Sequence, residues 1–217
     1  MSLIKRIVAM EWSVLQPDPS TSTRNLFPGI VLSVLLAVTG GSPAQVFASD
    51  YAATAYFGRM TDVHSWHDIL LHPGDVDFAN ANLLAGSMSW TFARYLDDAL
   101  NLELEGQAVR YFGDQDNWEF NVPVAVRWNR FPWNDTLATS TAFGLGPSYA
   151  TEVPPVEVEL EGESQRFLAY WFVELTLGPP KADWSAVLRL HHRSGGLGSI
   201  SKDGGSNSLG AGVKFSF

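Results

Sequence analysis

Hydrophobic and polar residues alternate along most of the chain after residue 48. The alternation is clearest over residues 100–108, where apolar or small side chains occupy the even positions and polar side chains the odd ones. A period of two places the two sets on opposite faces of a β-strand. Residues 118–128, 167–177, 184–194 and 208–217 repeat the pattern. Three weaker stretches, residues 51–59, 80–93 and 138–149, bring the predicted number of strands to eight.

The connections between the predicted strands alternate in length. Residues 95–98, 131–135 and 178–181 are short segments rich in turn-forming residues. Longer or more polar segments cover residues 60–78, 113–117, 150–165 and 195–206. Short turns at one end and longer loops at the other are typical of outer-membrane barrels, whose strands cross the bilayer with about 9–11 tilted residues. An even number of strands places both ends of the barrel segment on the short-turn, periplasmic side.

The two strand faces favour a barrel in a membrane over a barrel in water. The polar faces carry charges of both signs, at Glu103, Glu105, Glu119, Arg127, Glu174 and Arg189, which suits a small polar interior. The apolar faces carry tryptophans near strand ends, at Trp90, Trp118, Trp128 and Trp184, as an interfacial girdle does. The alternative is a soluble exported barrel or sandwich with its apolar face inward. We predict an all-β fold, an eight-stranded antiparallel transmembrane β-barrel over residues 49–217.

Residues 1–48 have the order of a secretory signal. Basic residues come first (Lys5, Arg6 and Arg24), followed by the apolar run at residues 30–38 and small residues ending at Ala48. The apolar run is too short for a spanning helix, which needs about 20 residues. Cleavage after Ala48 is favoured over cleavage after Ala44, and an N-terminal anchor helix is the alternative. Export and a barrel together predict the bacterial outer membrane.

Composition excludes several kinds of chemistry. The chain of 217 residues has no cysteine, which excludes disulfides, thiolate zinc sites, iron–sulfur clusters and a cysteine nucleophile. Its net charge of −9 argues against nucleic acid as a partner. His64 and His67 have the spacing of two metal ligands, but no third ligand is suitably spaced, so no metal site is expected.

One pair of residues carries candidate chemistry. His192 and Ser194 share a strand face with Leu188 and Leu190, the face assigned to lipid, at the outer end of the seventh strand. An imidazole is the usual base that activates a serine nucleophile. The backbone N–H groups of Gly195 and Gly196, which follow directly, are candidates for holding an oxyanion. The alternative is that both are merely polar residues at the membrane interface.

The end of the chain resembles a known family. A signal peptide, eight short strands and His-x-Ser ending the penultimate strand, within LRLHHRSGGLGSISKDGGSNSLGAGVKFSF, resemble the lipid A deacylase (PagL-type) family of outer-membrane barrels. The resemblance implies a serine esterase without a cofactor that hydrolyses an ester-linked acyl chain of lipid A, with His192 as base and Ser194 as nucleophile. It also places Gly195 and Gly196 at the oxyanion.

The third member of the site departs from that family. The family's catalytic Glu lies shortly before or at the start of the last strand, where this chain has Asp203 and Asn207 but no Glu. Asn207 shares the outward parity of Leu209 and is a candidate to orient His192 without a charge, as Asn does in Cys–His–Asn sites.

Two functions from different classes follow from these residues. The first is a lipid A deacylase-like esterase whose partners are lipopolysaccharide and outer-membrane lipid. The second is a non-catalytic barrel with a structural or adhesive role, and a narrow pore is disfavoured because side chains fill the interior of eight strands. By parity, His191 and Arg193 point into that interior. Acidic residues alternate with apolar ones over 156–163, which predicts strands that extend beyond the membrane as a hairpin.

Overall fold

The computed structural model describes residues 49–62, 66–71, 73–196 and 204–217. The predicted signal at residues 1–48 and the candidate residue Asp203 therefore lie outside the described residues. The strands, in chain order, are β1 (Tyr51–Thr61), β2 (Phe78–Tyr95), β3 (Leu100–Gly113), β4 (Trp118–Asn121), β5 (Val124–Trp128), β6 (Ala138–Ala150), β7 (Phe167–Gly178), β8 (Trp184–Ser194) and β9 (Gly205–Ser216). Two short helices, α3 (Trp66–Leu71) and α4 (Pro155–Glu161), and a 3₁₀ turn at Pro73–Asp75 lie in the connections. Neither helix is long and apolar enough to span a bilayer, in this described part of the chain.

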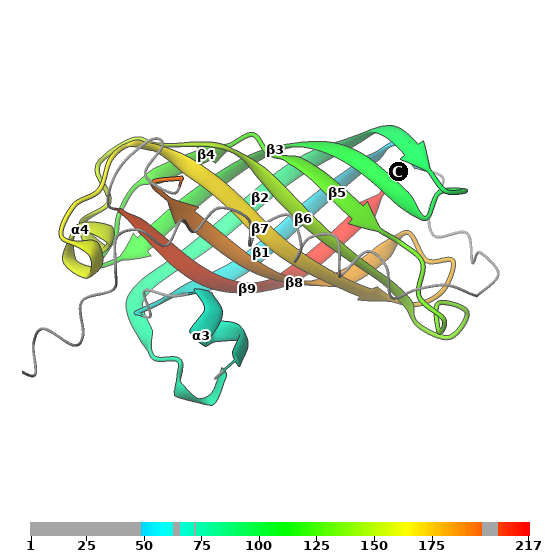
Figure 1. The fold of residues 1–217 in the computed structure, drawn as a ribbon, viewed down its shortest axis with the longest axis horizontal. Helices are drawn as coiled ribbons and strands as arrows, with labels where there is room; N and C mark the ends of the chain where they lie inside the picture. The colour runs from blue at the N-terminus through cyan, green and yellow to red at the C-terminus, as the bar shows by residue number, and fades with distance from the viewer. Residues whose placement is uncertain (1–48, 63–65, 72, 197–203) are drawn as a thin grey trace, which may run out of the picture. The chain divides into compact units, whose positions relative to one another are not determined.

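The strands form one antiparallel sheet that closes on itself (Figure 1). β9 pairs with both β8 and β1, so the last strand joins the first. At this seam the Tyr51 N–H donates to Phe217 O at 3.4 Å, and the Phe217 N–H donates to Tyr51 O at 2.9 Å. Because β4 and β5 together occupy one position between β3 and β6, the ring has eight strands. The predicted eight-stranded barrel is confirmed.

The strand predicted over residues 118–128 is interrupted where β4 ends and β5 begins. Pro123 lies at the break and has no N–H to donate to a ladder. Neighbouring backbone groups maintain the pairing, since the Glu105 N–H donates to Pro123 O at 2.9 Å and the Val122 N–H to Pro147 O at 3.2 Å. The side-chain alternation passes through the break unchanged, with Val122 and Val124 both exposed.

The two ends of the barrel differ as predicted. The short turns after β2, β5 and β7 lie at the end that holds Tyr51 and Phe217, and the longer connections containing α3 and α4 lie at the other end (Figure 1). In outer-membrane barrels the short turns are periplasmic. The candidate residues at the end of β8 therefore lie at the outer end.

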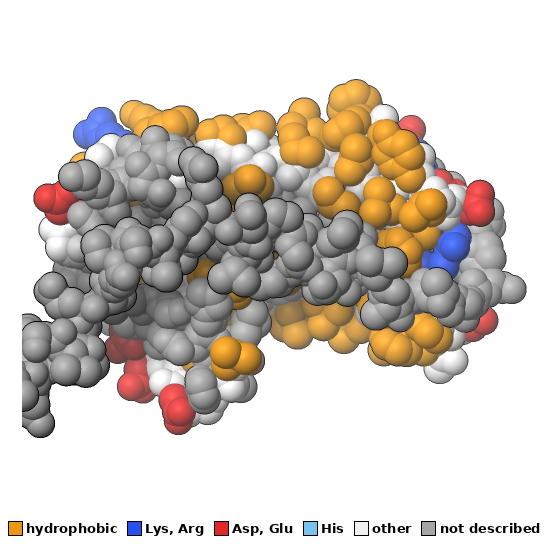
Figure 2. Space-filling model, viewed as in Figure 1, with side chains coloured by type: hydrophobic (Ala, Val, Ile, Leu, Met, Phe, Trp, Pro, Cys, Tyr) orange, Lys and Arg blue, Asp and Glu red, His pale blue; other side chains and the backbone are white. Residues whose placement is uncertain are grey.

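The outer wall is apolar. Large hydrophobic side chains are exposed on every strand, among them Phe57, Leu84, Leu104, Val126, Phe143, Val173, Leu188 and Val213. Apolar side chains cover much of the visible wall in Figure 2, and charged side chains gather toward the two ends. Trp90, Trp118 and Trp184 are exposed near strand ends, as a membrane-interface girdle requires. An apolar surface this large is unfavourable in water, and contact with lipid accounts for it.

The interior is polar and filled. Arg127 donates to Glu103 at 2.7 Å and to Glu174 at 2.7 Å, and Arg189 donates to Glu105 at 2.7 Å and pairs with Glu174. Each buried charge thus faces a charge of opposite sign, which offsets the cost of removing it from water. The polar strand faces point inward, as predicted.

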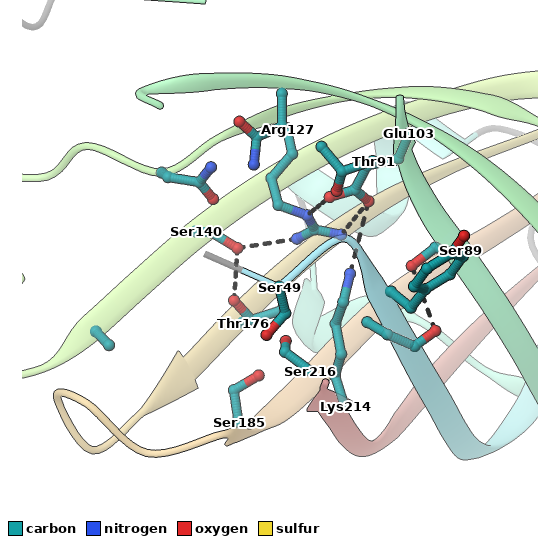
Figure 3. Close-up of a pocket in the computed structure, with 15 residues that line it drawn as sticks. Ser49, Ser89, Thr91, Glu103, Arg127, Ser140, Thr176, Ser185, Lys214 and Ser216 are labelled. Atoms are coloured by element: carbon teal, nitrogen blue, oxygen red, sulfur yellow. Dashed lines mark hydrogen bonds and ion pairs between the residues drawn. The ribbon is translucent and has the colours of Figure 1, made fainter. Parts of the chain in front are cut away.

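A small cavity opens among hydroxyl groups near the periplasmic end (Figure 3). Its volume is about 50 Å³, and Lys214 and Arg127 reach toward Glu103 beside it. This volume holds roughly three or four water molecules. Arg127 joins Glu103 and Glu174 across the interior beside it, so this cavity is not evidence for a pore.

The predicted extension of strands over residues 156–163 is wrong. This segment forms α4, which begins after Pro154 and ends at Gly162, where φ is 83°. Pro155 at the first turn favours a helix start, and the Gly162 N–H donates to Val158 O at 2.9 Å. Within this helix Glu157 is fully buried.

Candidate active site on the lipid-facing wall

His192 lies on the outer face of β8, near the outer end of the barrel. Alternation along β8 sends Ser185, Val187 and Arg189 inward and Leu188 outward. His192 follows the outward parity of Leu188. The strand pairing places it directly between Trp171 of β7 and Asn207 of β9.

Asn207 and His192 are joined by a hydrogen bond. The distance between His192 Nδ1 and Asn207 Oδ1 is 2.7 Å, and both residues are buried. An amide oxygen only accepts, so this bond needs the proton on Nδ1. In the neutral imidazole, Nε2 then carries the lone pair that a general base uses. The amide therefore fixes the ring orientation and the tautomer without supplying a charge.

An aromatic stack covers the other side of the imidazole. The ring centres of Trp171 and His192 are 4.3 Å apart, at 33° to each other. Trp66 from α3 meets Trp171 edge-on, with ring centres 5.6 Å apart. His192 is only 9% exposed, so it is shielded although it lies on the outer wall. Burial holds the ring in one place and removes competing water from it.

Ser194 occupies the next outward position on β8. Its neighbours across the ladder are Ala169 of β7 and Gly205 of β9, both small. Ser194 is half-buried, and no hydrogen bond joins its hydroxyl to His192 among the residues that the structure describes. Catalytic hydrogen bonds often form only with substrate bound. Neither neighbour carries a side chain larger than a methyl group.

The predicted oxyanion donors differ from each other in this structure. The Gly195 N–H donates to Gly204 O at 3.1 Å, so it has no free hydrogen for a substrate. The β8–β9 ladder thus continues one residue beyond Ser194, and the oxyanion role of Gly195 stays a prediction that this hydrogen bond disfavours. Gly196 lies in the turn that follows, with φ of 64°, a conformation that favours glycine.

The neighbouring inward residues lie where parity placed them. His191 Nδ1 is 2.9 Å from Tyr56 Oη, and His191 Nε2 is 3.0 Å from Glu119 Oε1. Arg193 donates to Glu157 Oε1 at 2.7 Å. The prediction that both side chains belong to the interior is confirmed.

Two residues near the site were not identified from the sequence. Glu157 and Ser206 lie directly behind it and bind each other, with Ser206 Oγ donating to Glu157 Oε1 at 2.8 Å. The Pro154-Pro155 pair was the available signal, because proline at a first turn predicts a helix rather than a strand. No sequence signal indicated that Glu157 points inward.

No protein-family model and no curated protein matches this sequence. Solved structures do match the fold. The crystal structure of the outer-membrane enzyme PagL superposes with a TM-score of 0.55 and 11% identity, over 76% of this chain and 99% of that chain. Neisserial surface protein A gives 0.47 and 13%, over 79% and 100% of the two chains. The N-terminal barrel domain of Pseudomonas aeruginosa OprF gives 0.45 and 16%, over 78% and 98%.

Fold and surface together define the class of protein. The closed ring of eight strands, the apolar outer wall and the paired interior charges are those of a transmembrane barrel. The protein is an eight-stranded β-barrel of the bacterial outer membrane.

Proposed function

We propose that this barrel is a serine esterase that hydrolyses an ester-linked acyl chain of lipid A in the outer leaflet. The hydrogen bond between His192 and Asn207 on the lipid-facing wall is the observation that carries the proposal. A histidine oriented by a side-chain carbonyl, two residues before a half-buried serine, is an arrangement that a purely structural wall does not need.

The steps follow from the chemistry of the groups. His192 Nε2 takes the proton from Ser194 Oγ as the oxygen attacks the ester carbonyl. The oxyanion that forms accepts a hydrogen bond from the Gly196 N–H. His192 then gives the proton to the leaving sugar oxygen. Water then hydrolyses the acyl-serine with His192 again as base, releasing a fatty acid. The scheme uses no cofactor.

The substrate reaches this site from the membrane. Ser194 opens on the wall that contacts lipid, at the outer end, where the acyl chains of lipopolysaccharide meet its saccharide.

A non-catalytic barrel is the second candidate function. The hydrogen bond from the Gly195 N–H to Gly204 O favours it, because one of two expected oxyanion donors is already used. The absence of a carboxylate at Asn207 points the same way, since an amide stabilises an imidazolium less than a carboxylate does.

Fatty-acid release from purified lipid A in detergent separates the two candidates. We expect the folded wild type to release fatty acid and Ser194→Ala to reduce the rate to background. Ser216→Ala, which removes a serine hydroxyl at the opposite end of the barrel, is the matched control and retains full activity. Barrel folding is checked in each sample by heat-modifiable gel mobility. A folded wild type that releases no fatty acid would establish the non-catalytic alternative.

A further inference from the structure

Glu157 brings a carboxylate from the outer loop into the mouth of the barrel. It belongs to α4 and is 0% exposed. Its Oε1 accepts hydrogen bonds from Arg193 Nη1 at 2.7 Å and from Ser206 Oγ at 2.8 Å. Its Oε2 accepts one from Ser164 Oγ at 2.6 Å. One side chain therefore connects three separate segments: α4 with its following loop, β8 and β9.

The two strand partners of Glu157 alternate with the site residues. Arg193 lies between His192 and Ser194 on β8, and Ser206 directly precedes Asn207 on β9. Successive side chains on a strand point to opposite faces. The carboxylate thus fastens the inner side of the same strand ends that carry the site on their outer side.

Arg193 also binds the backbone of the loop that follows α4. Its Nη2 donates to Gln165 O at 3.3 Å and to Arg166 O at 3.2 Å, and its Nε donates to Ser148 Oγ at 2.9 Å. The guanidinium is fully buried. Arg193 also lies 3.6 Å from Glu119 Oε2, so Glu157 is the nearer of its two carboxylate partners. Removing a partner from a buried charge of this kind is destabilising.

The strand ends need such a constraint. Ser194 pairs with Gly205 at the last register position of β8 and β9, and the hydrogen bond from the Gly195 N–H to Gly204 O closes the ladder. Terminal ladder positions open at low free-energy cost. Geometry errors of about 1 Å cost a catalytic site roughly 100-fold in rate.

We infer that Glu157 is a positioning residue for the lipid-facing site. It holds His192, Ser194 and Asn207 in register by clamping Arg193 and Ser206 from inside the barrel. It does not touch substrate, because it lies on the opposite side of the wall. This inference rests on the proposed esterase function for its catalytic consequence, and its structural part is independently measurable.

The test compares Glu157→Gln, Glu157→Asp and the control Glu159→Gln in the full-length barrel in detergent. Glu159 is an exposed residue of the same helix, so its variant makes the same chemical change without breaking a buried contact. Two quantities are measured: amide hydrogen exchange at Gly195, with Val187 in the middle of β8 as internal reference, and kcat and KM for fatty-acid release from lipid A.

In Glu157→Gln we expect exchange at Gly195 to quicken about tenfold, because a charged hydrogen-bond partner is lost, with Val187 unchanged. We expect kcat to fall about tenfold with KM unchanged, because positioning and not binding is lost. Glu157→Asp restores part of both effects, and Glu159→Gln matches the wild type.

The results separate the inference from the function on which it rests. Exchange at Gly195 that is equal in Glu157→Gln and in the wild type overturns the inference, whatever the activity. A wild type with no activity, together with faster exchange in Glu157→Gln, overturns the esterase and leaves the clamp established. Faster exchange with unchanged kcat shows a clamp without a catalytic role, which also overturns the positioning inference.

Discussion

Two adjacent histidines on β8 have opposite surroundings. His191 points into the barrel, where Tyr56, Tyr111 and the Glu119 carboxylate surround its ring at 2.9, 3.3 and 3.0 Å. His192 points to the lipid side, where Asn207 binds one ring nitrogen and Trp171 covers one face. The same residue type, one position apart, is thus a member of a buried network on one side and a candidate base on the other.

The two rings differ in how many of their nitrogens contact a polar partner. Both nitrogens of His191 contact polar partners, so the ring serves the interior network. In the buried set that the structure describes, five carboxylates (Glu103, Glu105, Glu119, Glu157 and Glu174) face four cationic side chains (Arg127, Arg189, Arg193 and Lys214). His192 has a single polar partner among the contacts described above, and its Nε2 is the nitrogen that our proposed mechanism uses.

The largest effect is expected when the two histidines themselves are substituted. His192→Ala removes the proposed base and should lower kcat/KM for fatty-acid release by about 10³-fold, within the range for general-base loss. His191→Phe keeps an aromatic ring inside the barrel but removes the contacts with Tyr56 and Glu119. It should change the rate of the folded fraction by less than about threefold, since His192 Nε2, the proposed proton acceptor, is left in place. Kinetics on lipid A with both variants check this. Equal losses in the two variants would remove the functional distinction between the inner and outer rings.

The second prediction concerns the interior face of β8. Arg189→Met leaves Glu105 and Glu174 without a shared cation and should lower the free energy of unfolding by about 3–5 kcal/mol. Leu188→Ala, at the neighbouring outward position, should cost less than about 1 kcal/mol, because Leu188 is 54% exposed to the surroundings. Urea unfolding in lipid vesicles measures both. A small cost for Arg189→Met would mean that these ion pairs contribute little to stability.

The third prediction concerns an arginine at the lipid-facing position next to the inward-pointing Arg189. Leu188→Arg should destabilise the barrel by about 2–4 kcal/mol in vesicles, because a lipid-facing arginine is costly near the bilayer centre. Leu71→Arg, on the exposed surface of α3, is the control and should change stability by less than about 0.5 kcal/mol. If the two substitutions cost the same, the outer wall of β8 does not face lipid.

The smallest expected effect sharpens the role of Asn207. Asn207→Leu removes the hydrogen bond that orients His192 and should lower kcat about tenfold. Asn207→Glu supplies the carboxylate that the resembling family uses and should raise kcat about tenfold, since a negative charge stabilises the imidazolium. Steady-state kinetics of both variants test the pair of effects. A faster Asn207→Leu would show that orientation by Asn207 is not part of the reaction.

The predicted strands agree with the structure because their signal is local. Side-chain alternation is a property of extended backbone, and one face here meets lipid while the other meets a filled polar interior. The same rule correctly sent His191 and Arg193 inward and kept Asn207 on the side of His192. The strand predicted over residues 118–128 breaks at Pro123, for the equally local reason that proline lacks an N–H.

The wrong prediction over residues 156–163 arose from contacts across the barrel mouth, which a local pattern does not show. The segment at residues 156–163 also alternates, yet it is helical, because the Pro154-Pro155 start and the burial of Val156 and Glu157 override a short period-two pattern. The Gly195 N–H was assigned to an oxyanion, and the ladder uses it for Gly204 instead.

The sequence by itself determined the class of fold, the number of strands and the face on which each strand residue lies, because a period of two follows from the geometry of a single extended strand. Only the tertiary structure decided the interior partners: Glu103 with Arg127, and Glu157 with Arg193. These pairs are separated by 24 and 36 residues. They meet because the sheet closes and fixes its register, which no local pattern of residues encodes.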